Sequence, residues 1–348
     1  MHNVFITSNL PGRTVVLNNV SWLYFSGTSY LGMSQHPDFH RLLAEGIQRY
    51  GANFGGSRRS NLRLQVYEQA EQYLATYTGA EAALTVSSGT LAGQLAVQIL
   101  SGAGKFYFAP GVHPALFGEG DYTTSDYDTW VGFILEQVWR HKTPIVLFSN
   151  ALDPLRVRAF DFSWLWQLPS ETPLTLVLDD SHGIGVRGRA GAGIHTTLNL
   201  PPQVELLVVA SLGKAMAIPG GMLLGRHERI KAAWQHPFFG GASPAVPAYL
   251  HAMLQAAPLY EAARQILFRH IEALQIATQP LKLFQTMQAY PVFYTTENAL
   301  VPFLQQHRML ISSFPYPSPE DPLLTRLIVS AAHTSEDIAL LIRLLKMF

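Results

Sequence analysis

The chain has 348 residues, of which 48% are hydrophobic and 14% charged, and its 24 basic and 24 acidic residues leave a formal net charge of zero. This composition is that of a well-buried globular protein and excludes an intrinsically disordered chain. The balanced charge gives no electrostatic reason to expect binding to nucleic acid or to an anionic membrane. The absence of cysteine excludes disulfides and thiolate metal sites, so a cytoplasmic enzyme or binding protein is expected.

The N-terminal third predicts a hairpin followed by two helices. Residues 13–25 form two apolar runs around Asn18-Asn19, which is typical of a tight hairpin turn. Residues 38–50 have a helical apolar spacing, and the stretch LRLQVYEQAEQYLATYTG predicts a second helix that Gly79 ends. No run of 18 apolar residues predicts a membrane span, and the first residues lack the basic start and apolar core of a signal peptide.

The middle of the chain predicts an α/β fold with a mostly parallel central sheet. Short apolar strands alternate with stretches of helical spacing, which is typical of a sheet covered by helices on both faces. The low charge of so large a chain also favours apolar surface covered by a second copy. The predicted strands are AALTVSS, KFYFA, PIVLFS, LTLVLDD, ELLVVAS and GGMLLG.

The C-terminal part predicts a smaller α+β domain. We expect one long helix over about 244–276, weaker strands around 290–295, 308–312 and 325–331, and a last helix opened by the capping pattern Thr334-x-x-Asp337. The N-terminal arm is expected to pack onto this domain. The predicted division is an arm at 1–45, a large domain at 46–236 and a small domain at 237–348.

Two glycine motifs in the sequence do not predict nucleotide sites. GIGVRG at 183–188 fits the dinucleotide pattern, but the residues that follow it have no helical periodicity. SGAGK, which ends at Lys105, lacks the first P-loop glycine and has Phe106 where a hydroxyl residue should bind magnesium.

Acidic residues stand where the strand LTLVLDD ends. Asp179 and Asp180 fall at the edge at which open α/β sheets bind ligands, and His182 follows closely. Taken alone, the acids are more readily read as the end of a strand and the cap of a turn. A metal site is the other alternative, but no third ligand is evident nearby.

The stretch SSGTLAG at 87–93 joins a predicted strand to a predicted helix. Free backbone N–H groups and the helix dipole favour a phosphate at such a junction, and an ordinary turn capped by serine is an equal alternative.

Lys214 is one of six lysines and directly follows the buried strand ELLVVAS. Poor solvation there lowers the pKa of an amine, and a neutral amine can form a Schiff base with a carbonyl. A surface lysine on a loop is the alternative. With an anion-binding turn and a strand-end acid, this lysine fits pyridoxal 5′-phosphate (PLP), whose pyridinium needs an anion to stay protonated.

The sequence resembles the fold-type I PLP-dependent enzymes of the class I/II aminotransferase superfamily, and in particular the α-oxoamine synthases, such as 8-amino-7-oxononanoate synthase and glycine C-acetyltransferase. The resemblance covers nearly the whole chain and implies the PLP-dependent transferase fold and an obligate homodimer. The segments that carry it are SYLGM at 29–33, YGANFGGSR at 50–58, SSGTLAG at 87–93, DDSHGIGVRGRAGAG at 179–193, SLGKAMAIPGG at 211–221 and RLIVSAAHTSEDI at 326–338.

The resemblance implies a role for each matched residue. Lys214 would be the Schiff-base lysine and proton shuttle, Asp179 the partner of the pyridinium nitrogen, and His182 the partner of the ring's phenolic oxygen. The remaining cofactor contacts would be a stacking ring from His113, backbone amides from Gly89 and Thr90, and hydroxyls from Ser88 and Ser211.

The departures from the family pattern concern the substrate. Ser312, in ISSFPYP, takes the place of the arginine that grips the amino-acid carboxylate in the family, and Arg326 is a candidate to compensate. In LFSNALDP at 147–154 the family's usual glutamate is missing. We therefore predict an intact PLP site with an altered substrate side.

The predicted activity is a PLP-dependent decarboxylative condensation of an amino acid with an acyl thioester such as an acyl-CoA. Transamination is the first alternative, since it shares the early steps. A non-catalytic partner protein that keeps the fold is the alternative of a different class.

Overall fold

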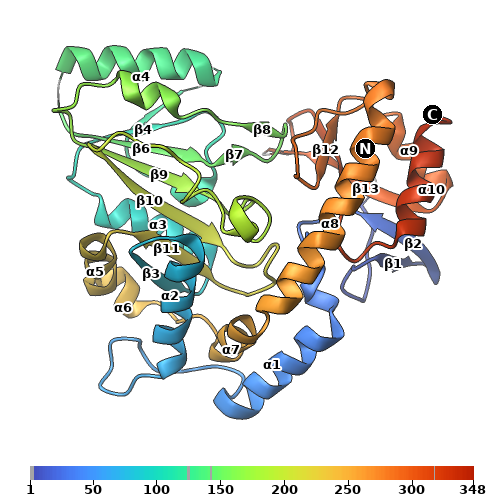
Figure 1. The fold of residues 1–348 in the computed structure, drawn as a ribbon, viewed down its shortest axis with the longest axis horizontal. Helices are drawn as coiled ribbons and strands as arrows, with labels where there is room; N and C mark the ends of the chain where they lie inside the picture. The colour runs from blue at the N-terminus through green and yellow to red at the C-terminus, as the bar shows by residue number, and fades with distance from the viewer. Residues whose placement is uncertain (1–3, 124–125, 142, 317) are drawn as a thin grey trace.

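The computed structural model describes residues 4–123, 126–141, 143–316 and 318–348, which form two sheets with helices around them (Figure 1). The larger sheet has seven strands in the order β3-β11-β10-β9-β6-β4-β5. Their bounds are β3 (Ala82–Val86), β4 (Lys105–Phe108), β5 (Asp121–Tyr122), β6 (Ile145–Asn150), β9 (Leu174–Asp179), β10 (Val204–Ser211) and β11 (Gly221–Gly225).

The six strands predicted for the middle of the chain are all present, and the sheet is mostly parallel as predicted. The exception is β11, which runs antiparallel to both β10 and β3. Only residues 212–220 connect β10 to β11, and a parallel return needs a crossover of a dozen or more residues. The short connection therefore forces one antiparallel strand into the sheet.

Helices cover both faces of this sheet, as predicted. Alternate residues of a strand point to opposite faces, so Val177 packs in the cluster with α3 (Gly89–Ile99) and α5 (His227–Gln235). Its neighbours Leu176 and Leu178 pack in the cluster with α4 (Tyr127–His141). Burial on both faces is why these strands read as continuous apolar runs.

The smaller sheet joins the two ends of the chain, in the order β1-β2-β13-β14-β12. Its strands are β1 (Thr14–Leu17), β2 (Val20–Phe25), β12 (Val292–Thr295), β13 (Met309–Pro315) and β14 (Leu323–Ile328). The predicted hairpin is confirmed, since β1 and β2 pair antiparallel around Asn18 and Asn19, both with positive φ. β2 pairs with β13, so the N-terminal arm packs onto the C-terminal part as expected.

The helices predicted for the two ends of the chain are present with one exception, and α6 and α9 were not predicted. The long helix expected over 244–276 is wrong: two helices, α7 and α8, meet at Ala256, whose ψ of 4° is not helical. Pro258 at the start of α8 removes a backbone donor and favours the break. The capping box of Thr334 and Asp337 is confirmed at the start of α10. The bounds are α1 (Pro37–Tyr50), α2 (Gln65–Thr78), α6 (Pro237–Gly241), α7 (Pro247–Gln255), α8 (Ala257–Thr278), α9 (Leu300–Gln306) and α10 (Ser335–Leu345).

Short elements complete the chain: strands β7 (Leu152–Asp153) and β8 (Arg158–Ala159), and 3-10 helices at Met33–Gln35, Pro114–Leu116, Ser163–Gln167, Arg189–Gly191 and Gln279–Leu281. Within the described residues, none of the helices combines the length and the apolar character needed to cross a membrane. The division at residues 45 and 236 stays a prediction.

Candidate active site

The carboxyl ends of the parallel strands bring the predicted site residues to one edge of the large sheet. Asp179 ends β9, where Asn150 of β6 and Val209 of β10 are its neighbours across the two ladders. Ser211 ends β10, and Lys214 follows in the connection to β11. Helix α3 begins at the same edge, directly after β3, because β3 runs parallel to the strands at the centre.

Lys214 is half-buried beside a carboxylate. Desolvation by burial lowers the pKa of its amine, and the negative charge of Asp179 opposes that shift. The two side chains are therefore close enough to interact electrostatically. The lowered pKa makes the neutral, nucleophilic amine accessible nearer to neutral pH than in a solvated lysine.

The carboxylate of Asp179 is only 8% exposed and faces a histidine ring. Its Oδ1 accepts a hydrogen bond from the N–H of Ser181 at 2.8 Å, and its Oδ2 lies 3.8 Å from Nδ1 of His113. The His113 Nδ1 accepts the N–H of Ala115 at 3.1 Å, which puts the ring proton on Nε2. The ring is 44% exposed, so one face of it is open to a ligand beside Asp179.

Asn150 fixes the segment that carries this ring. Its Oδ1 accepts the backbone N–H of His113 at 3.0 Å, and its Nδ2 donates to the carbonyl of Gly111 at 2.8 Å. An amide can make both bonds at once, whereas a carboxylate can only accept. The departure in LFSNALDP was evident from the sequence, but this role was not. An asparagine at the end of an apolar strand was the available signal.

His182 is held by Tyr30, which lies far from it in the sequence. The hydroxyl of Tyr30 is 2.8 Å from Nδ1 of His182. Burial lowers the pKa of His182 well below its ordinary value, and the positive charges of Lys214 and Arg326 lower it further, so the ring is neutral. In the sequence SYLGM stands out only as a motif, and the function of its tyrosine was missed.

The two adjacent acids have different environments. Asp180 is buried and accepts the backbone N–H of Ile194 at 2.7 Å, and desolvation raises its pKa to about 7. A Cβ on Gly183 or on Gly193 would come within 2.0 Å or 2.3 Å of its carboxylate. Asp180 therefore anchors the glycine-rich loop, and Asp179 is the acid that faces the site. No group of three metal-ligating side chains occurs among the described residues.

The sequence left two alternatives for the turn between β3 and α3, a phosphate site and an ordinary turn capped by serine, and the turn has features of both. Ser88 caps the helix, since its Oγ accepts the N–H of Leu91 at 3.0 Å. The first intrahelical bond runs from Ala92 to the carbonyl of Ser88, so the N–H groups of Gly89 and Thr90 precede the hydrogen-bonded part of the helix. These are the groups that bind an anion at a helix N-terminus.

Gly89 also lets this turn approach the end of β10. A Cβ at Gly89 would lie 2.6 Å from Cβ of Ser211 and 2.9 Å from its Cα. The hydroxyl of Ser211 accepts the N–H of Gly213 at 3.2 Å and keeps its own proton for another acceptor. The turn and the lysine-bearing segment thus meet at a distance that only glycine permits.

Ser312 and Arg326 are direct cross-strand neighbours in the small sheet. Nη1 of Arg326 donates to the carbonyl of Pro154 at 3.0 Å. Its Nε is buried and has no hydrogen-bond partner among the residues that the structure describes, and the same holds for the hydroxyl of Tyr290. The positive charge of Arg326 acts to lower the pKa of both Tyr30 and His182, so it lies close to both side chains. Buried donors without partners mark a place for a polar ligand.

These features fit PLP. The amine of Lys214 suits the aldehyde of the cofactor, and the carboxylate of Asp179 suits its pyridinium. The neutral imidazole of His182 suits the phenolic oxygen, and the close-packed turn at Gly89 and Ser211 suits the phosphate.

The fold is that of the fold-type I PLP-dependent enzymes. The structure matches a PLP-bound serine palmitoyltransferase from S. paucimobilis with a TM-score of 0.84 and 16% identity, over 99% of this chain and 92% of that one. The sequence profile described as aminotransferase class I and II matches residues 162–345.

Two relatives in sequence carry the name 8-amino-7-oxononanoate synthase. The one from Dechloromonas aromatica is 28% identical over 96% of this chain and 92% of its own length. The one from Mycolicibacterium smegmatis is 30% identical over 73% of this chain and 70% of its own length. The chain belongs to the aminotransferase class I and II family and is a PLP-dependent transferase.

Proposed function

We propose that the chain condenses an amino acid with an acyl thioester. In this reaction the bond from Cα to the carboxylate breaks and CO2 leaves, a bond forms from Cα to the acyl carbon, and the thioester C–S bond breaks to release the thiol. The product is an α-amino ketone. The curated relatives are named for such a product, 8-amino-7-oxononanoate. The observation that carries the proposal is the position of Lys214 beside Asp179 at the carboxyl edge of the sheet, where burial lowers the pKa of its amine.

The residues would divide the work as follows. PLP supplies an electron sink when it is bound. The carboxylate of Asp179 would keep the ring nitrogen protonated, and Nε2 of His182 would donate to the phenolic oxygen, since Tyr30 occupies Nδ1. The amine of Lys214 would hold the aldehyde carbon and, once displaced, move a proton at the substrate Cα. His113 would cover one face of the ring.

The phosphate would lie at the start of α3. The N–H groups of Gly89 and Thr90 would bind its oxygens, with hydroxyl donors from Ser88 and Ser211. Each of these hydroxyls accepts one backbone N–H and keeps a proton to donate.

Arg326 would receive the carboxylate of the amino acid. Its unpartnered Nε provides a donor, and the carbonyl of Pro154 fixes the guanidinium from the other side. Ser312, the cross-strand neighbour of Arg326, has a small side chain that would leave room for a carboxylate beside the guanidinium. A single arginine on β14 would thus replace the grip that the family pattern assigns to the Ser312 position on β13.

We further propose a homodimer in the cytoplasm. Large apolar side chains are exposed around the segment that follows α1 and around α6, including Leu62 and Phe238. Ser57 binds the carbonyl of Gly240, so these two segments are neighbours. Burial of this apolar surface against a second copy would stabilise the pair.

The test has two stages. The purified protein with PLP should show an absorption band at ~420 nm that borohydride bleaches, and Lys214→Ala should lack it. Adding an amino acid and an acyl-CoA should then release free thiol and CO2. An amino-group transfer to a 2-oxo acid without thiol release would indicate an aminotransferase instead. A colourless protein in excess PLP would remove the catalytic proposal altogether.

A further inference from the structure

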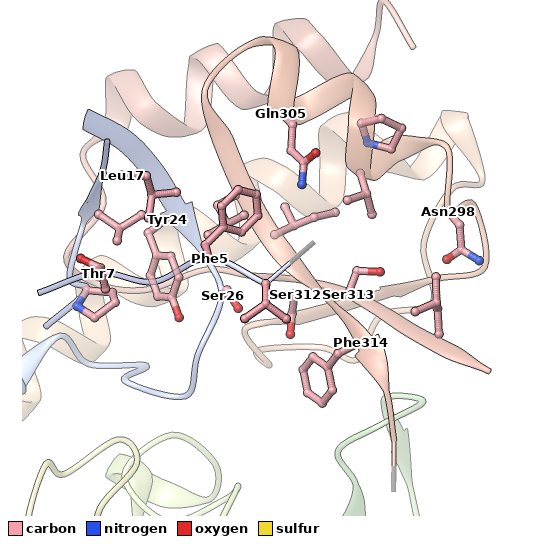
Figure 2. Close-up of a pocket in the computed structure, with 18 residues that line it drawn as sticks. Phe5, Thr7, Leu17, Tyr24, Ser26, Asn298, Gln305, Ser312, Ser313 and Phe314 are labelled. Atoms are coloured by element: carbon pink, nitrogen blue, oxygen red, sulfur yellow. The ribbon is translucent and has the colours of Figure 1, made fainter. Parts of the chain in front are cut away.

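A cavity of about 570 Å³ lies beside the small sheet, and Ser312, Ser313 and Phe314 of β13 are among the residues that line it (Figure 2). Strand β2 pairs with β13 only as far as Phe25 and Ile311, where β2 ends, while β13 continues to Pro315 and pairs with β14 along its other edge. Residues of β13 beyond this point line the cavity, and so do residues of the N-terminal arm and α9.

Among the residues that the structure describes, none of the side chains lining this cavity carries a formal charge. Apolar side chains make up a little more than half of the lining, and the polar groups are hydroxyls and amides, such as those of Ser313 and Gln305. Arg13, on the arm between two lining residues, is held by a bidentate bond to Asp337 at 2.6 and 2.8 Å. The representative apolar lining residues are Phe5, Leu17, Val301, Leu310 and Phe314.

Two short connections link the cavity to the candidate active site. Ser312 lines the cavity and lies opposite Arg326 in the ladder. Ser26 also lines it, and it precedes by four residues Tyr30, whose hydroxyl binds His182. The volume of the cavity falls in the range of pockets that enclose small organic ligands.

We propose that this cavity binds the acyl chain of the thioester substrate and that it selects chains with an uncharged far end. This inference rests on the proposed function. The apolar lining favours a hydrocarbon chain, and the hydroxyls and amides tolerate a neutral polar group. A carboxylate at the far end would lose its hydration without meeting a cation, which is costly.

The test compares two thioesters of equal length, octanoyl-CoA and octanedioyl-CoA, which differ only in the terminal carboxylate. Calorimetric titration of the PLP-loaded protein without amino acid measures binding directly. We expect octanoyl-CoA to bind about tenfold or more tightly than octanedioyl-CoA. Equal affinities, or a preference for octanedioyl-CoA, would overturn the inference.

Variants on α9 test where the acyl chain of the substrate binds. Val301→Trp fills the cavity and should weaken octanoyl-CoA binding by about tenfold while leaving acetyl-CoA unchanged. Gln306→Trp, on an exposed position of the same helix that does not line the cavity, is the matched control and should change neither. Val301→Arg supplies a cation and should shift the preference toward octanedioyl-CoA. Unaltered octanoyl-CoA binding in a folded Val301→Trp would place the chain elsewhere.

Failure of the proposed function gives a different result. If no acyl-CoA releases thiol with any amino acid, the condensation is wrong, and the binding comparison still decides whether the cavity takes a neutral chain. If thiol is released but Val301→Trp leaves the chain-length preference unchanged, the condensation stands and the acyl pocket is wrong.

Discussion

The hydroxyl of Tyr30 and Nδ1 of His182 are 2.8 Å apart, although 152 residues separate them in the chain. Burial raises the pKa of Tyr30 to about 12 and lowers that of His182, so both groups are neutral near pH 7. With the tyrosine as the donor to Nδ1, the imidazole proton lies on Nε2. In that tautomer the pair presents one N–H donor to a ligand.

Tyr30→Phe should weaken PLP binding by roughly five- to tenfold, since it removes one hydrogen bond worth about 1 kcal/mol and frees the His182 tautomer. Spectral titration of the protein with PLP measures the change. Tyr127→Phe, which removes a hydroxyl at the start of α4 that donates to the carbonyl of Asp161, should bind PLP like the parent protein. Equal losses in the two variants would contradict a specific role for Tyr30.

Lys214 should reduce the stability of the protein without PLP. Its folded-state pKa is lowered by burial, so below that pKa the folded protein must bury a charged amine. Lys214→Met should therefore raise the melting temperature at pH 7. The gain should shrink as pH rises through the lowered pKa toward 10.5, where the unfolded lysine also becomes neutral. Thermal melts at pH 7, 9 and 10.5 test this sign.

Lys231→Met is the control for this experiment, because Lys231 is exposed on α5. Its melting temperature should follow that of the parent protein at every pH. A Lys214→Met protein that melts below the parent at pH 7 would show that desolvation of this lysine does not destabilise the fold.

The elements of the fold were largely predictable because their signals are local. Apolar runs, the Asn18-Asn19 turn and the Thr334 cap each act within a few residues, and all are present. The single helix expected over 244–276 failed at Ala256, where the break depends on the nearby Pro258 and on how two helices pack. Helical periodicity alone does not register such a break.

The site was predictable in part. Residue types at strand ends indicated Asp179 and Lys214, because parallel strands bring their ends together. The partners that orient these groups come from other segments. Asn150 meets His113 only when β6 lies beside β9, and Tyr30 meets His182 only when the N-terminal segment crosses to the large sheet. No local pattern encodes such contacts.

Asp180 is the acid that anchors the glycine-rich loop, and Asp179 is the acid that faces the site, so the pH dependence of stability should change when Asp180 is replaced. Burial raises the pKa of Asp180 to about 7, against 3.8 in a solvated carboxyl. Between these values the folded state binds more protons, so stability falls as pH rises. Asp180→Asn should remove this loss and be more stable than the parent at pH 8, with little difference near pH 4.

Asp180→Ala completes that comparison, since it leaves the buried N–H of Ile194 without its acceptor. Relative to Asp180→Asn, the cost should be about 1–3 kcal/mol at either pH. Urea unfolding at pH 4 and pH 8 measures both variants. An Asp180→Asn protein whose stability keeps the parent's pH dependence would assign that dependence to other groups.

The close approach of Gly89 to Ser211 predicts opposite effects for two Gly→Ala substitutions in helices. At Gly89 the new Cβ would meet Ser211 at 2.6 Å, so Gly89→Ala should destabilise the protein by about 1–3 kcal/mol and displace the turn from the end of β10. Gly132 is exposed in α4, and a Cβ there would have no other atom within 4 Å among the described residues, so Gly132→Ala should stabilise by roughly 0.5–1 kcal/mol.

Urea unfolding measures both changes, and titration with inorganic phosphate as a competitor of PLP shows whether only Gly89→Ala loses the anion site. A Gly89→Ala protein that binds PLP and phosphate normally would mean that the turn does not need this contact to hold an anion.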